Sequence, residues 1–118
     1  MSPARKDPRH RAREAALQIL YQWDVAGNDV QQAATLFFNE QWPSGDPAPG
    51  DVRTFAVALA ADTVQRLAEI DAVIADTAER WRPERMAVLD RLILRMAVCE
   101  LMRGHGTPSP VVINEALE

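Results

Sequence analysis

The stretch at residues 88–103, VLDRLILRMAVCELMR, constrains the fold more than any other part of this 118-residue chain. At about 100° per residue, its apolar side chains spread around nearly the whole circumference of a helix. Such a helix belongs inside a protein with other helices packed around it. It is too short and too charged to cross a membrane. We therefore expect residues 88–103 to be the central helix of an all-α bundle. One face of this helix carries Leu89, Leu92, Ile93, Met96 and Ala97.

The length of the chain suits a single domain with one core. We assign residues 9–118 to one all-helical domain and residues 1–8, which contain Pro3 and Pro8, to a flexible basic arm. The chain has no signal-peptide pattern and no apolar run near 20 residues, which indicates a cytoplasmic protein without a membrane partner. Its one cysteine, Cys99, lies among apolar neighbours and is expected to be a small buried hydrophobe.

The first predicted helix runs from Arg9 to near Gly27. Its expected buried arc comprises Ala12, Ala15, Ala16, Ile19, Leu20 and Trp23. Tyr21 projects almost opposite this arc, with His10 on its side and Arg13 on one flank. An exposed ring near a basic cluster suits stacking on an unpaired base. Packing of the ring under a loop or a neighbouring helix accounts for the pattern equally well.

Further helices follow the same apolar period, and we expect about six in all. Asn28 or Asp29 can cap the second helix, and the Pro- and Gly-rich segment 43–50 is an internal loop. A long third helix is expected to break near residues 70–71, with Asp71 as a new cap. Pro83 then forces a turn, and residues 109–118 open a last helix.

Charge is unevenly distributed along the chain. Residues 1–13 contain five basic residues and one acidic residue, a net of +4, so the remaining 105 residues sum to −8. A basic arm on an acidic body indicates a localised anionic partner, although a solvated tail is the simpler interpretation of a charge run. Arg91 and Arg95 lie four residues apart on the central helix. They either form surface ion pairs with acidic residues of the third or fourth helix, or extend the basic surface.

Catalytic and cofactor motifs are absent from the sequence. His10 and His105 have no second ligand at metal-binding spacing, and no phosphate-binding glycine loop is present. Glu100 shares an arc with apolar residues, where a structural ion pair or hydrogen bond is the expected role. We therefore expect no enzyme activity, no cofactor and no metal.

Three blocks of sequence together resemble the NusB family of bacterial transcription antitermination factors. They are RHRAREAALQILYQWD at 9–24, LDRLILRMAVCEL at 89–101 and PVVINEALE at 110–118. The resemblance implies an all-α fold of two packed helical subdomains without catalytic activity. It also implies binding of single-stranded boxA RNA from ribosomal RNA leaders together with NusE, a small-subunit ribosomal protein, within the antitermination complex of RNA polymerase.

The resemblance also implies which residues contact RNA. In the family the arginine-rich start of the first helix and a tyrosine further along serve this role, as does an acidic–basic pair at the start of the central helix. The corresponding residues here, with His10 and Arg95 added from the helical pattern, are Arg9, His10, Arg11, Arg13, Tyr21, Asp90, Arg91 and Arg95.

The chain departs from the family pattern at one end. The family usually continues into a further helix with an FVNGVL-like motif that these 118 residues lack. This difference leaves open the pairing of two copies as a homodimer. Two other functions also stay open, an RNA-binding domain related to RNA cytosine methyltransferases and a protein-interaction module without RNA binding.

Overall fold

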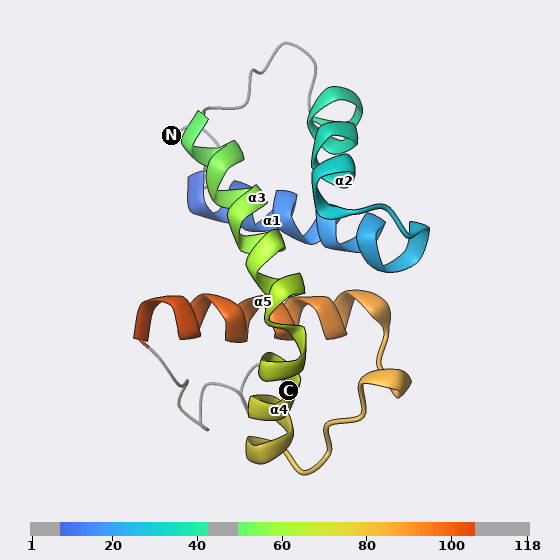
Figure 1. Cartoon of the computed structure of the whole chain (residues 1–118), viewed down its shortest axis with the longest axis vertical. Coiled ribbons are helices and arrows are strands. Elements are labelled where there is room, and N and C mark those ends of the chain that lie inside the picture. The colour runs from blue at the N-terminus through green and yellow to red at the C-terminus, as the bar shows by residue number, and fades with distance from the viewer. Residues whose placement is uncertain (1–7, 43–49, 106–118) are drawn as a thin grey trace, which may run out of the picture. The chain divides into compact units, whose positions relative to one another are not determined.

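The computed structural model describes residues 8–42 and 50–105, and every regular element within these ranges is helical (Figure 1). The predicted all-α fold is confirmed. The α-helices are α1 (Pro8–Tyr21), α2 (Val30–Leu36), α3 (Gly50–Gln65), α4 (Leu67–Thr77) and α5 (Val88–His105). Short π-helical turns continue α1 and α2, namely η1 (Gln22–Ala26) and η2 (Phe37–Gln41), and a 3₁₀ turn, η3 (Pro83–Arg85), precedes α5. Of the arm predicted at residues 1–8, only Pro8 is described, and it begins α1. Residues 1–7 and the predicted last helix at 109–118 lie outside the described residues.

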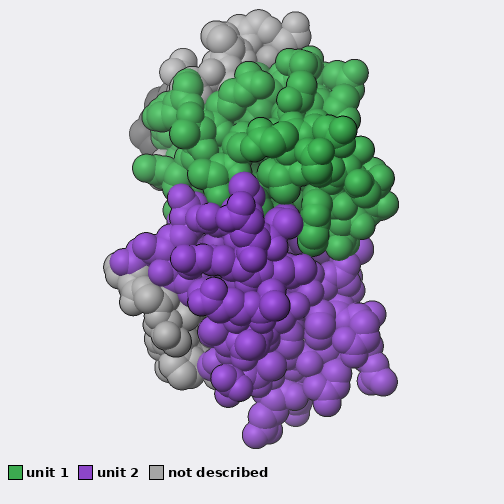
Figure 2. Space-filling model, viewed as in Figure 1, with its two compact units in different colours: residues 1–60 green, residues 61–118 purple. Residues whose placement is uncertain are grey.

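The chain divides into two compact units, residues 1–60 and residues 61–118 (Figure 2). Helix α3 runs from the first unit into the second. None of the described helices is both long enough and apolar enough to span a membrane.

The core of the first unit forms where α1 packs on α2 and η2. The predicted arc of α1 is confirmed at five positions, which are Ala12, Ala15, Ala16, Ile19 and Leu20, each almost completely buried. Trp23, the sixth predicted position, is half-buried in η1. The facing residues Ala33 and Ala34 of α2 are also buried. Small side chains on both helices let the two backbones approach closely, so the longer Ile19 and Leu20 fill the space beside them.

The turn between α1 and α2 follows its sequence signals. Gly27 ends η1 with φ of 78°, a left-handed conformation that glycine adopts without strain. Asp29 then caps α2, because its Oδ1 accepts a 2.9 Å hydrogen bond from the amide of Gln32. The Gln32 side chain accepts in return from the Asp29 amide at 3.4 Å. This reciprocal pair is a capping box, and it fixes where α2 begins.

In the second unit α4 packs on α5. The junction between α3 and α4 is a distortion at Arg66 (φ −102°, ψ 18°), so the break expected near residues 70–71 occurs earlier in the chain. Asp71 was expected to cap a new helix, and this expectation is wrong. Its carboxylate instead accepts hydrogen bonds from Arg95 of α5.

Helix α5 buries a broad arc in which Leu92, Leu94 and Val98 are almost fully enclosed. The face that carries Leu89 and Ile93 is the more exposed one, with 44% and 46% of these residues accessible. Since the helix is apolar almost all round, the period of its sequence does not select one buried side. Tertiary contacts make that selection, among them the packing on α4 and the hydrogen bond between Cys99 and Thr63 of α3.

Cys99 is fully buried on α5, as predicted. Burial raises the pKa of its thiol above the usual value, an effect to which nearby Asp62 adds, while a hydrogen bond with Thr63 opposes it. The thiol is therefore neutral at physiological pH and poorly suited to act as a nucleophile.

A pH-dependent stability follows from this raised pKa. The folded state favours the protonated thiol, so this contribution is complete below the unfolded pKa of about 9 and declines as pH rises through the folded pKa. We expect the unfolding free energy of the wild type to fall relative to that of Cys99→Ala as pH rises past the unfolded pKa of about 9. Urea denaturation of both proteins on either side of this pH measures the difference. A constant difference would contradict the prediction.

Candidate nucleic-acid interface

The basic start of α1 is organised by aromatic rings of the first unit. The Arg9 guanidinium lies 4.1 Å from the centroid of the Phe55 ring on α3, and that of Arg11 lies 4.5 Å from the centroid of the Trp42 ring. Such cation–π contacts are worth about 0.5–1 kcal/mol at exposed sites. They hold the planar guanidinium groups in defined orientations. Arg13, two residues further along α1, is half-buried.

Tyr21 is the last residue of α1, and 37% of it is exposed. The helical period places it on the side opposite the buried alanines, together with His10 and Glu14. His10 Nε2 and a Glu14 carboxylate oxygen lie 2.8 Å apart on this exposed side. The tyrosine ring therefore lies outside the core, on the same helix as the basic cluster.

Sequence reasoning missed an aromatic cluster at the end of α2. Phe37, Phe38 and Trp42 pack with ring centroids 5.1 to 6.1 Å apart. A third arginine, Arg53 of α3, places its guanidinium 4.9 Å from the Phe38 ring centroid. The spacing of the segment FFNEQW at 37–42 was the available signal. Three arginine–aromatic contacts within one small unit provide several flat, positively charged surfaces of the kind that unpaired bases stack on.

The remaining sequence-predicted site residues lie in the second unit, at the start of α5. Asp90 is exposed in the first turn. The Nη1 atom of Arg91 donates a 2.9 Å hydrogen bond to the carbonyl oxygen of Pro83 in η3. This bond connects the turn before α5 to the helix and orients the Arg91 side chain.

Arg95 forms a two-pronged ion pair with Asp71 of α4. Its Nε donates to Asp71 Oδ1 at 2.9 Å and its Nη2 donates to Oδ2 at 2.8 Å. Only 9% of the Arg95 side chain is exposed. This geometry matches the first of the two alternatives for Arg95, an ion pair with the fourth helix, and it gives the guanidinium a structural partner.

The described residues contain no cluster of three His, Cys, Asp or Glu side chains that could hold a metal ion. The structure thus presents the predicted residues as two sets, one on α1 in the first unit and one on α5 in the second.

Comparison with known proteins matches residues 10–118 to the NusB family model. The NusB transcription antitermination protein of Solibacter usitatus is 46% identical over 114 residues, covering 93% of this chain and 73% of the relative. The corresponding protein of Koribacter versatilis is 43% identical over 110 residues with the same coverage. A chain in a solved structure titled "Crystal Structure of a Plectonemic RNA Supercoil" has the same fold, with a TM-score of 0.69, 23% identity, and coverage of 93% of this chain and 76% of that chain.

Proposed function

The chain belongs to the NusB family, and from this membership we propose that it is a transcription antitermination factor that binds single-stranded boxA RNA together with NusE. Its curated relatives are named as antitermination proteins and not as enzymes. We place its action in the antitermination complex of RNA polymerase, where it recognises nascent ribosomal RNA leaders.

The observation that carries the RNA-binding part is the exposure of Tyr21 on the helix that begins with the basic cluster. In this mechanism Arg9, Arg11 and Arg13 neutralise backbone phosphates, and an unpaired base stacks on the Tyr21 ring. His10 lies on the same exposed side of α1 as Tyr21 and supplies a further hydrogen-bonding group. Phosphate contacts supply affinity and position, while base contacts select the strand.

We assign contacts with the RNA to both units. Asp90 and Arg91 at the start of α5 are proposed to contact the RNA from the second unit, with Arg91 oriented by its bond to Pro83. Arg95 is proposed to be a positioning residue, because its ion pair with Asp71 joins α4 to α5 one helical turn after Arg91. Its loss should act on RNA binding through helix position and not through a lost phosphate contact.

NusE is needed in this proposal because the protein as a whole is acidic. The net charge is −4, so attraction to RNA comes from local basic groups and not from the charge of the whole protein. A small cluster on an acidic body binds RNA weakly on its own. A partner that adds contact area and its own base contacts raises the affinity and narrows the choice of sequence.

Fluorescence anisotropy with a short labelled boxA RNA tests the proposal across a salt series, with and without NusE. We expect weak binding alone, tighter binding with NusE and an affinity that falls steeply with salt. Arg13→Ala should weaken binding to all strands and lower the slope of log affinity against log salt by about 1. Arg80→Ala, which removes an exposed arginine outside the proposed surface, is the matched control.

Two results would overturn this function. Equal affinity for boxA and a scrambled strand in the presence of NusE would reduce the binding to non-specific charge attraction. Unchanged association in both Arg11→Ala and Arg13→Ala would favour the alternative of a protein-interaction module without RNA binding.

A further inference from the structure

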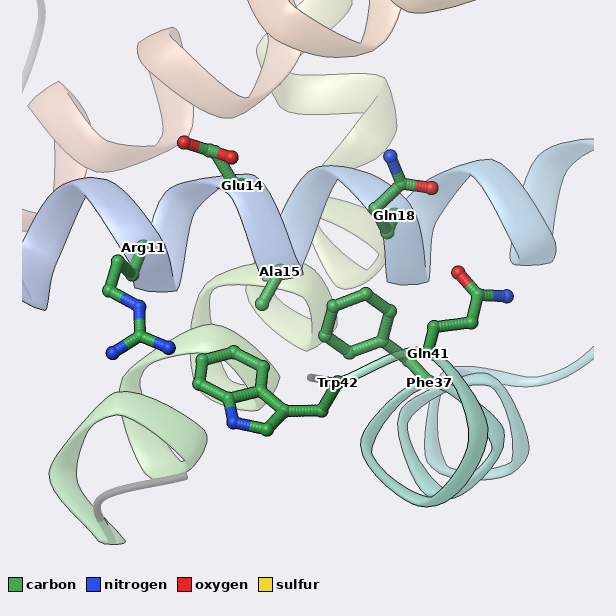
Figure 3. Close-up of a pocket in the computed structure, with 7 residues that line it drawn as sticks. All are labelled: Arg11, Glu14, Ala15, Gln18, Phe37, Gln41 and Trp42. Carbon is green, nitrogen blue, oxygen red and sulfur yellow. The ribbon is translucent and has the colours of Figure 1, made fainter. Parts of the chain in front are cut away.

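A cleft of about 410 Å³ lies beside α1, between that helix and η2 in the first unit (Figure 3). Arg11 and Trp42 face each other at one end, and the amide side chains of Gln18 and Gln41 lie toward the other (Figure 3). The Phe37 ring lies between these two ends, beside Ala15 (Figure 3). The cleft therefore combines an aromatic wall, a cation and neutral hydrogen-bonding groups. Glu14 also lines it, and its carboxylate lies 2.8 Å from His10 Nε2.

We propose that this cleft binds one unpaired adenine of the RNA strand, a step that rests on the proposed function. The indole and guanidinium planes suit a purine ring, which stacks on aromatic and arginine surfaces. A glutamine amide presents a donor and an acceptor together, and this pair matches the N6 amino group and N7 of adenine. An unpaired uracil offers a donor–acceptor pair only on its Watson–Crick edge, through N3–H and O4, and its smaller ring provides less surface for stacking on the indole and guanidinium planes.

Continuity with the basic surface supports RNA as the source of the base. Arg11 belongs both to the basic start of α1 and to the lining of the cleft. Its guanidinium lies 4.5 Å from the Trp42 ring centroid, so a strand whose phosphate is bound by Arg11 reaches the mouth of the cleft. A base that swings out of the strand there needs little rearrangement of the protein.

The two glutamines provide the test because both are exposed and neither belongs to the core. Gln18→Ala and Gln41→Ala remove the amides while leaving Trp42 and Phe37 in place. Gln31→Ala, an exposed glutamine of α2 outside this cleft, is the matched control. Thermal unfolding of all three variants checks that the fold is retained.

The first experiment measures affinity for boxA RNA with NusE present, using strands in which each adenine in turn is replaced by an abasic site. We expect one abasic position to weaken wild-type binding about 5- to 50-fold, within the range of a good base contact. An abasic site at that position should weaken RNA binding by Gln41→Ala much less, because this variant has already lost the contact with the base. Gln31→Ala should behave like the wild type.

The second experiment titrates adenosine monophosphate and uridine monophosphate separately into the full chain, with saturation-transfer NMR as the readout. We expect adenosine monophosphate to bind at least several-fold more tightly, and Gln41→Ala to remove this preference.

Equal binding of the two nucleotides overturns the adenine assignment. Wild-type RNA affinity in both cleft variants, alongside a loss in Arg13→Ala, overturns the cleft proposal and leaves the antitermination function standing. If the chain fails to bind boxA RNA but still prefers adenosine monophosphate, the proposed function is wrong and the cleft assignment stands.

Discussion

Replacing Arg95 by alanine is expected to lower the free energy of unfolding by about 3 kcal/mol, the lower end of the range for breaking a buried ion pair. The reason is the partner that remains. Asp71 would keep its charge with 29% of its side chain exposed, and both of its carboxylate oxygens would lose a charged donor. The partial exposure of Asp71 lets water replace some of this interaction, so a larger cost is not expected. Urea denaturation followed by circular dichroism measures the change.

A second ion pair in the same unit provides the control. Arg103 Nε lies 3.1 Å from Asp62 Oδ2, and these side chains are 30% and 37% exposed. Removing Arg103 should therefore cost well under 1 kcal/mol. The double variant Arg95→Ala with Asp71→Ala should be less destabilised than the sum of the two single variants, since no carboxylate is left unpaired. Equal costs for Arg95→Ala and Arg103→Ala would contradict this account.

The first helix was predictable because its sequence allows one solution. The buried positions Ala12 and Ala16 alternate with charged or polar residues at a strict helical period, so only one side can face a core. Gly27 and Asp29 mark the following turn by local chemistry, a left-handed residue and a capping box. Both signals act over a few residues and need no tertiary information.

The central helix shows where sequence reasoning ends. Leu94 and Ile93 are adjacent and similar in hydrophobicity, yet the first is buried and the second is nearly half exposed. Periodicity cannot separate them on a helix that is apolar almost all round. The choice depends on tertiary packing, including the bond from Arg95 to a residue of α4 that lies 24 positions earlier in the chain. Such a pairing leaves no local mark in the sequence.

The candidate site likewise has one feature that the sequence predicts and one that only the structure reveals. The outward position of Tyr21 follows from the helical period of α1 alone, and the structure agrees with it. The stacking of Arg11 on Trp42 could not be predicted from this period, because the two residues belong to segments that the turn between α1 and α2 separates in the sequence. The cleft beside α1 could therefore be found only after both segments were placed.

Replacing Tyr21 by alanine should weaken binding of boxA RNA about 10- to 100-fold in the presence of NusE, the cost of losing one stacked base. The ring is exposed at the end of α1, so its contribution to folding is small compared with its proposed contribution to stacking. Anisotropy titrations at fixed salt give the affinity, and thermal unfolding shows whether the fold is retained.

Two further variants separate base stacking from simple apolar contact. Tyr21→Phe keeps the aromatic plane and should stay within about 3-fold of the wild type, whereas Tyr21→Leu keeps apolar bulk without a plane and should behave like Tyr21→Ala. Val25→Ala removes an exposed apolar side chain one turn further along, in η1, and should leave the affinity unchanged. The slope of log affinity against log salt should be the same in every Tyr21 variant, because the ring carries no charge. A reduced slope in Tyr21→Ala would show that the substitution had displaced the arginines, and wild-type affinity in Tyr21→Leu would remove the stacking platform from the mechanism.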